Sequence, residues 1–416
     1  MIDKVLHTPE GVRDIYNTEC ERKISLETKL QSVIHTYGYK DIQTPTIEYF
    51  DIFSDERGTV SSKHIYKFDD REGNTLVLRP DITPSIARCV AKYYKDETKP
   101  IRLCYSGKTF VNNSSYQGKL KETTQMGAEL INDGSIDADA EMIAMSIHCL
   151  LASGLTEFQI EIGHVDFFKA LVEEAKLSSE DEEELRIRIQ DKNMFGVEEI
   201  LAGKEIDEEL KHLFYTMPEL FGSLEKIVAV KSMTNNKKAI KAIECLEKIY
   251  DFIRIYGFEK YISFDLGMLS MYNYYTSIIF RAYTYGTGDS VLGGGRYNHL
   301  LEQFGKNAPA IGMGINIDYL MAALTRQKKW KKKELNELMI FYTKEMRKEA
   351  IEAAAKYREV GRVVELCYTE SIVNVDEIKQ YLYSNQVNEI MLFFKEKQEI
   401  IYIDYNDVVY SEKRSI

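Results

Sequence analysis

Apolar residues recur every three to four positions over residues 17–37, and this spacing predicts a long amphipathic helix near the start of the chain. Thr18, with Glu21 three residues later, is the predicted N-cap, because the pair matches a capping box. Gly38 ends the pattern, as glycine commonly does after a helix.

Later segments switch between strand-like and helical patterns. Alternating or short apolar runs predict strands over residues 64–69, 75–78, 101–111, 122–131, 261–267, 273–285 and 290–292. One helix is predicted after Pro84. Another begins near Asp137, where acidic residues suit the first turn of a helix. Strands with segregated helices predict an α+β fold, in which helices flank a largely antiparallel sheet.

Changes in composition along the chain predict its domain organisation. Residues 172–256 are rich in Glu, Lys and Leu and predict a helical insertion into a core made of 1–171 and 257–325. A basic run opens a predicted linker over 326–337. Strand and helix patterns alternate again over 338–416, which predicts a small C-terminal α/β domain.

The overall charge and hydropathy make nucleic acids and membranes less expected as binding partners of this chain. The 416 residues carry a formal net charge of −12, which makes binding to tRNA less expected because nucleic-acid binders usually present basic patches. The N-terminus has no apolar signal-like segment, and no run approaches the roughly 18 apolar residues of a membrane helix. We therefore expect a cytoplasmic protein without a membrane anchor.

Cysteine and histidine spacing gives no sign of a metal site. None of the six cysteines is in CxxC spacing, and none of the seven histidines is in an HExxH motif. Free thiols in a reducing compartment are the predicted state of the cysteines. We expect neither a metal nor a cofactor.

Four segments, in order, resemble the class II histidyl-tRNA synthetase family. They read TPEGVRD at residues 8–14, LRPDIT at 78–83, QGK at 117–119 continued by QMGAE at 125–129, and finally YYT at 274–276, GGGRY at 293–297 and AIGMG at 310–314. Singly these motifs are weak, since a glycine triplet is more often a tight turn than a site. Together they cover most of residues 1–325 and imply a class II synthetase-like core.

This chain differs from that family at the residues that bind ATP in the family. Fixed guanidinium groups suit phosphate because they are always charged and bond it in a bidentate way. The family's motif-2 arginine and glutamate correspond here to Val111 and Asn113, its arginine before the Tyr pair to Ser270, and its motif-3 arginine to Tyr319. Losing even one preorganised donor typically costs about a hundred- to a thousand-fold in rate. The departures imply a chain with no catalytic residues.

The same resemblance implies that residues for binding histidine are retained. An acidic residue and a threonine receive the amino group in that family, a glutamate accepts from the imidazole N–H, and the second tyrosine of the pair faces the other ring nitrogen. The implied histidine-binding residues are Asp81, Thr83, Gln125, Glu129, Tyr274 and Tyr275. The alternative is that these side chains form a satisfied internal polar network. The usual partner of the ligand carboxylate is lost at Ser270.

This combination is similar to the ATP phosphoribosyltransferase regulatory subunit family. The resemblance implies a hetero-octamer with the short-form catalytic subunit, a dimer through the synthetase-like core, and L-histidine as the feedback effector in the first step of histidine biosynthesis. Many members of that family end soon after the core, whereas this chain continues through 338–416 with a tail like a reduced anticodon-binding domain. A divergent active histidyl-tRNA synthetase therefore stays open, and a kinase regulator or tRNA-mimic sensor is a remoter alternative.

Overall fold

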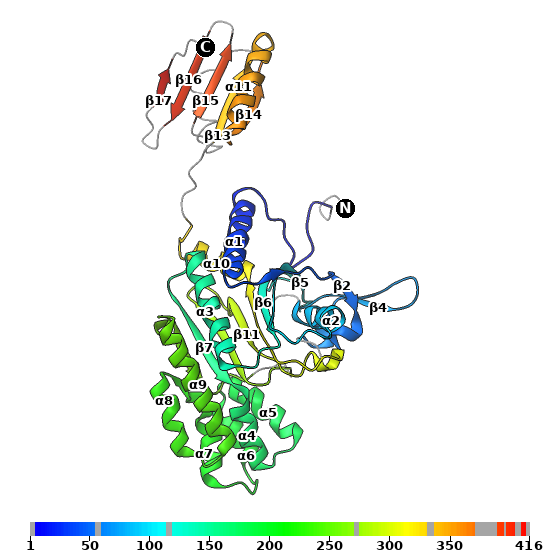
Figure 1. The fold of residues 1–416 in the computed structure, drawn as a ribbon, viewed down its shortest axis with the longest axis vertical. Helices are drawn as coiled ribbons and strands as arrows, with labels where there is room; N and C mark the ends of the chain where they lie inside the picture. Colours follow the sequence, from blue (N-terminus) through cyan, green and yellow to red (C-terminus); the bar gives the residue numbers. More distant parts are fainter. Residues whose placement is uncertain are drawn as a thin grey trace. The chain divides into compact units, whose positions relative to one another are not determined.

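The computed structural model divides into two compact units, Met1–Trp330 and Lys331–Ile416, which are described separately (Figure 1). The residues it describes are 5–54, 60–113, 119–269, 274–330, 337–370, 389–394, 397–403 and 409–412. No helix within these ranges is long and apolar enough to cross a lipid bilayer.

A nine-stranded sheet forms the centre of the first unit, in the order β1-β5-β6-β12-β11-β10-β7-β9-β8. Its strands are β1 Lys40–Asp41, β5 Ile101–Phe110, β6 Glu122–Ile131, β7 Phe158–His164, β8 Phe221–Gly222, β9 Ile262–Asp265, β10 Ile278–Thr284, β11 Leu292–Arg296 and β12 Ala310–Asn316. The pairs β1–β5 and β7–β9 are parallel and the other pairs are antiparallel. The predicted α+β fold around a largely antiparallel sheet is confirmed.

Helices cover one face of this sheet with the main hydrophobic core. They are α1 Asn17–Thr36, α3 Ile136–Ser153, α9 Lys237–Ile255 and α10 Ile317–Arg326. Successive residues of a strand point to opposite faces. Met126, Ala128 and Leu130 of β6 therefore enter this core, and Gln125 and Glu129 turn to the other face.

The start of α1 differs from the prediction. The helix begins at Asn17, and the N-cap position is held by Tyr16, which has extended backbone and makes no side-chain capping bond. Thr18 already lies inside the first turn, so its prediction as N-cap was wrong. One polar residue of α1 is buried: Lys23 donates to Thr124 Oγ1 at 2.6 Å and pairs with Asp318 at 3.3 Å. This contact ties α1 to β6 and α10.

The opposite face of the sheet is partly covered by α2 (Thr83–Tyr93), which shares a second hydrophobic cluster with β5. A small antiparallel sheet precedes α2 in the chain and consists of β2 Ile47–Tyr49, β4 Thr75–Leu78 and β3 Lys67–Asp69. Because α2 follows directly after Asp81, the turn before it places polar side chains over β6.

Helices α4 to α9 lie between β7 and β9 in the chain. Helices α5 to α9 fall within residues 172–256, the region predicted as a helical insertion, whereas α4 begins before it, at Val165. The first five are α4 Val165–Ala175, α5 Ser179–Gln190, α6 Met194–Leu201, α7 Glu208–Thr216 and α8 Leu224–Ala229. They lie together at one end of the first unit (Figure 1). Leu185, Val197 and Phe214 are fully buried and join the main core, so these helices and the sheet share one interior.

The last residues of the first unit fall within the region predicted as a linker. Trp330 Nε1 donates to Thr325 Oγ1 at 2.8 Å, and Lys329 Nζ donates to Thr156 Oγ1 at 2.9 Å. The Arg22 guanidinium lies 5.4 Å from the centre of the Trp330 ring. Residues 326–330 thus pack on the core, and residues 331–336 lie outside the described part of the chain.

In the part that the structure describes, the second unit consists of a five-stranded sheet and helix α11. Its elements are β13 Glu337–Tyr342, α11 Arg347–Glu359, β14 Val363–Tyr368, β15 Glu389–Phe394, β16 Lys397–Ile403 and β17 Val409–Glu412. The order is β14-β13-β15-β16-β17, with β13 parallel to both of its neighbours. Leu338 and Ile340 of β13 pack against Ala350 and Ala354 of α11, which forms a separate small core.

Candidate functional site

Glycines of three adjacent strands form a floor without side chains on the sheet face opposite α3. Gly293 and Gly295 of β11 lie opposite Gly314 and Gly312 of β12, and Gly127 of β6 lies opposite Gly314. Register partners point to the same face, so all five glycines open onto it. The triplet that begins at Gly293 is therefore inside strand β11 and does not form a tight turn.

The glycines of β12 are required because side chains of β6 lie across them. A Cβ at Gly312 would lie 1.6 Å from Glu129 Oε2, and a Cβ at Gly314 would lie 2.7 Å from Gln125 Nε2. Neither position can take a side chain unless its neighbour moves. The floor therefore fixes where the two polar side chains of β6 lie.

Glu129 is a buried carboxyl held by hydroxyl groups. Thr83 Oγ1 donates to its Oε1 at 2.7 Å, and the Tyr297 hydroxyl donates to its Oε2. Burial raises the pKa of Glu129 to about 8, and the Asp81 charge adds to the rise, whereas hydrogen bonds from Tyr297, Thr83 and Tyr105 oppose it. In the described part of the chain no Lys or Arg pairs with this carboxyl, so a cationic or N–H-donating ligand would supply the missing partner.

Asp81 and Gln125 form the second polar group of the site. Asp81 Oδ1 accepts from Gln125 Nε2 at 3.1 Å and from the backbone N–H of Ile82 at 2.7 Å. Gln125 Oε1 is buried and accepts no hydrogen bond from the described residues. A buried acceptor without a donor costs free energy, which a ligand N–H group at this position would recover.

The tyrosine pair closes the site from the side of β10 and β11. The Tyr274 and Tyr275 ring centroids are 4.5 Å apart, and Tyr274 also contacts the Tyr297 ring edge-on at 5.8 Å. A Cβ at Gly295 would lie 2.7 Å from the Tyr275 ring, so this ring lies flat over the floor. All six residues implied by the resemblance thus gather on one face of the sheet. What they bind stays a prediction.

Three residues of this face were not among the predicted ones. Tyr297 follows the glycine triplet and contacts Glu129, and Tyr105 of β5 is buried beside Gly127, where a Cβ would lie 2.4 Å from its hydroxyl. Tyr297 belongs to the GGGRY motif and was open to prediction, whereas Tyr105 has the pattern of an ordinary core residue. Arg281 of β10 lies opposite Gly293 in the sheet and opens onto the same face.

The arginines of the sequence motifs have structural partners. Arg79 of LRPD donates to the Thr44 and Lys108 carbonyls at 2.8 and 2.9 Å. Arg296 of GGGRY pairs with Asp139 of α3 on the opposite face of the sheet, at 2.6 Å. The Arg296 guanidinium is therefore directed away from the glycine floor. The Arg79 guanidinium lies on the same face as the floor, over β5, because a Cβ at Gly107, the register partner of Gln125, would lie 2.1 Å from its Nη2.

The positions where the family's phosphate-binding residues are replaced carry local structural contacts. The Val111 N–H donates to the Lys121 carbonyl at 2.9 Å, and Asn113 Nδ2 donates to the Leu120 carbonyl at 3.1 Å. Tyr319 packs against the main core, where burial raises the pKa of its hydroxyl. Ser270 lies outside the described residues.

One cluster of potential metal ligands occurs at the edge strand, where sequence spacing had indicated none. Asp41 Oδ1 accepts from Gln31 Nε2 at 2.7 Å, from His35 Nε2 at 3.1 Å and from Cys104 Sγ at 3.4 Å. Burial and the Asp41 carboxylate raise the pKa of the Cys104 thiol to about 12, so the thiol is protonated. The cluster is therefore satisfied as a hydrogen-bonded network.

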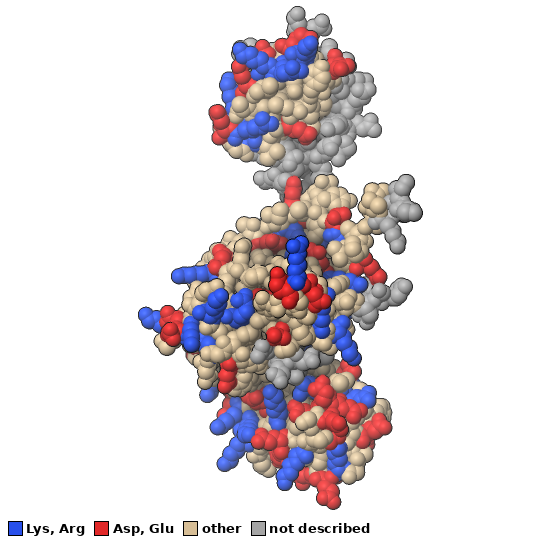
Figure 2. All heavy atoms as spheres, turned by 90° about the vertical axis from the view of Figure 1, so that its right-hand side faces the viewer, with Lys and Arg blue, Asp and Glu red and all other residues tan. Residues whose placement is uncertain are grey.

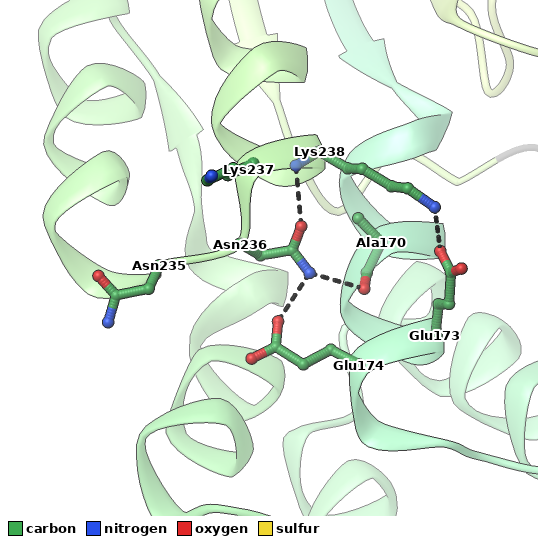
Figure 3. A pocket seen from close by; sticks show the side chains of 7 residues that line it. All are labelled: Ala170, Glu173, Glu174, Asn235, Asn236, Lys237 and Lys238. Atoms are coloured by element: carbon green, nitrogen blue, oxygen red, sulfur yellow. Dashed lines mark hydrogen bonds and ion pairs between the residues drawn. The ribbon is translucent and has the colours of Figure 1, made fainter.

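A surface pocket of about 410 Å³ lies between α4 and the start of α9, away from the glycine floor (Figure 3). Asn236 caps α9 and donates to the Ala170 carbonyl at 3.0 Å and to Glu174 at 2.7 Å. Lys238 pairs with Glu173 at 2.6 Å. These groups satisfy one another, as expected where two helices meet.

The chain is similar to known proteins over nearly its whole length. A profile of the histidyl-tRNA synthetase family matches residues 11–320. The ATP phosphoribosyltransferase regulatory subunit of Acetivibrio thermocellus is 42% identical over 366 residues, which are 88% of each chain. The protein of that name from Ruminiclostridium cellulolyticum is 38% identical over 407 residues, 98% of this chain and 96% of its own.

A solved structure agrees with these relatives. The crystal structure of an ATP phosphoribosyltransferase regulatory subunit/histidyl-tRNA synthetase from Bacillus halodurans is 32% identical, has a TM-score of 0.83, and covers 93% of this chain and 98% of that chain. The Ruminiclostridium match extends through most of 338–416, so this tail does not separate the chain from relatives of that name. The chain belongs to the histidyl-tRNA synthetase family and, within it, to the ATP phosphoribosyltransferase regulatory subunits.

Proposed function

We propose that the chain is the regulatory subunit of an ATP phosphoribosyltransferase and does not itself activate histidine with ATP. The observation that carries this proposal is that the synthetase-like site keeps its amino-acid-binding residues and has lost its phosphate-binding arginines. On its amino-acid side Gln125 and Glu129 lie against the glycine floor and Asp81 accepts from Gln125, whereas Val111 and Tyr319 stand where the family has phosphate-binding arginines. A site that can hold an amino acid without a nucleotide suits an effector better than a substrate.

We infer that the effector is L-histidine, bound over the glycine floor. Glu129 would accept from an imidazole N–H, and Tyr275 would face the other ring nitrogen. Asp81 and Gln125 Oε1 would receive the amino group, which satisfies the buried oxygen that lacks a donor. Hydrogen bonds to charged groups contribute about 1.5–3 kcal/mol each, so two of them would contribute about 3–6 kcal/mol to histidine binding.

The partner in this proposal is the short-form catalytic subunit, in a cytoplasmic hetero-octamer that contains dimers of this chain formed through the synthetase-like core. The regulatory subunit is required for transferase activity. Histidine binding here and the inactive state of the partner stabilise each other, because coupling between two sites is reciprocal. The names of the relatives support the partnership, and the stoichiometry comes from the family resemblance.

Charge distribution argues against tRNA as a partner. The net charge is −12, and Lys and Arg are interspersed with Asp and Glu over the described part of the face in Figure 2. A phosphate backbone is usually held by a basic stripe that releases counterions.

Two measurements on the full chain test the proposal. Co-expression with a short-form transferase should yield a complex whose activity requires both chains, and failure to associate would refute the partnership. Histidine-dependent exchange of pyrophosphate into ATP should be at background for the purified chain. Robust exchange would support the alternative, a divergent active histidyl-tRNA synthetase.

A further inference from the structure

Histidine in the proposed site needs a cation for its carboxylate. In the synthetase family an arginine before the tyrosine pair serves this role, and the corresponding position here is Ser270. An uncompensated carboxylate over this buried site would be costly, because the Asp81 carboxyl already lies there. A replacement cation must reach the floor from another element.

Arg281 reaches the floor from β10. It lies directly opposite Gly293 of β11, and its Cγ would be 4.0 Å from a Cβ at that glycine. The first side-chain atoms of Arg281 therefore lie on the sheet face to which Gly293 and Gly295 also open. The Tyr275 ring lies over Gly295 on the same face.

The distance from Arg281 to the amino-group side of the site fits one amino acid. Gly293 is the register partner of Gly314, and Gln125 Nε2 would lie 2.7 Å from a Cβ at Gly314. With antiparallel partners about 5 Å apart, the Gln125 amide and Arg281 Cγ are at most about 12 Å from each other. The guanidinium extends about 4 Å beyond Cγ. The guanidinium, two hydrogen bonds of about 2.9 Å and an α-ammonium and carboxylate about 3 Å apart together span about 13 Å, so one amino acid can connect Arg281 to the Gln125 amide within this upper limit.

Arg281 already interacts with other groups of the chain, so a ligand carboxylate would be an additional partner of its guanidinium. Its other register partner is Glu161 of β7. Burial and the Asp265 charge raise the pKa of Glu161, and the positive charges of Lys192 and Arg281 only partly oppose this rise. A guanidinium has five N–H donors in a planar fork, so it can bond Glu161 on one side and a ligand carboxylate on the other.

We propose that Arg281 receives the α-carboxylate of histidine and thereby takes over the role of the arginine lost at Ser270. This inference rests on the proposed effector site and names the residue that makes the site selective for an amino acid over an imidazole amine. It also explains how the chain binds histidine with a guanidinium supplied by a different strand.

The test compares two ligands in calorimetric titrations of the full chain. L-histidinol keeps the imidazole and amino group of L-histidine and has a hydroxymethyl group in place of the carboxylate. Wild type should bind histidine about 10- to 100-fold more tightly than histidinol. Arg281→Gln should lose that preference, with histidine weakened about 10- to 100-fold and histidinol changed less than about twofold. Arg281→Lys should keep part of the preference, because it retains the charge without the fork.

Each outcome bears on a different claim. Lys192→Gln is the matched control, since it removes a cation from the same edge and should leave the preference intact. Equal weakening of both ligands in Arg281→Gln, at an unchanged melting temperature, would overturn the carboxylate role. A wild type that does not prefer histidine would overturn it as well, with the proposed site still standing. A wild type that binds neither ligand would refute the effector site itself.

Discussion

Each face of the central sheet buries a carboxyl group, and the two carboxyl groups have different kinds of partner. On the helix-covered face, Asp139 of α3 is paired with the Arg296 guanidinium at 2.6 Å. On the glycine-floored face, the donors to Glu129 among the described residues are all hydroxyl groups, from Thr83, Tyr297 and Tyr105. Burial raises the pKa of both carboxyls, to about 6 for Asp139 and about 8 for Glu129.

The difference separates a structural carboxyl from one prepared for a ligand. Arg296 also donates to the Asp133 and Ser135 carbonyls at 3.0 and 3.1 Å, so the pair fixes the loop that starts α3. Glu129 keeps a high affinity for protons, which marks an incomplete set of partners. A protein that only needed stability would have little reason to bury this second carboxyl.

The largest expected effect is a loss of stability when the buried Asp139–Arg296 pair is broken. Asp139→Ala leaves the buried Arg296 guanidinium without its carboxylate and should lower the free energy of unfolding by about 3–5 kcal/mol. Denaturant unfolding measures the loss. The control is Glu173→Ala, which breaks the exposed pair with Lys238 and should cost at most about 1 kcal/mol. Similar losses in the two variants would remove the distinction between these pairs.

The next effect concerns the pH dependence of stability. A carboxyl whose pKa is about 8 when folded and near 4.5 when unfolded binds more protons in the folded state, so it lowers stability as pH rises through this window. Between pH 5 and pH 7 wild type should lose about 2–3 kcal/mol relative to Glu129→Gln, which cannot ionise. Asp139 titrates in both proteins and cancels in the difference. Parallel stability curves would mean that Glu129 ionises normally.

A smaller effect is expected when one hydroxyl partner of Glu129 is removed. Tyr297→Phe deletes a hydrogen bond that favours the ionised carboxyl, so the pKa of Glu129 should rise further and histidine affinity should fall about fivefold, or about 1 kcal/mol. Tyr319→Phe is the control, because that hydroxyl lies on α10, outside this network. Equal affinity in wild type and Tyr297→Phe would show that the hydroxyl does not support the carboxyl.

The fold could be predicted from local sequence signals, whereas the residues of the candidate site came from the resemblance to the synthetase family, and their binding of histidine stays a prediction. Apolar periodicity predicted the segregated strands and helices, and short motifs carried Asp81, Gln125 and Glu129. Sequence reasoning did not reach Arg281 or Tyr105, because their roles depend on sheet register between strands far apart in the chain. The reason for glycine at position 295 could not be predicted either, since the side chain that crosses Gly295 comes from Tyr275, in a different segment of the chain.

The claim that this face of the sheet is an effector site is tested most directly in the reconstituted complex with a short-form transferase. Histidine inhibition is titrated for wild type and Glu129→Gln, each relative to its own uninhibited rate, with Glu122→Gln on the same strand as the matched control. Glu129→Gln should raise the half-inhibitory histidine concentration at least about tenfold, and the control should match wild type. Identical inhibition in all three complexes would contradict the account and would place the histidine site elsewhere.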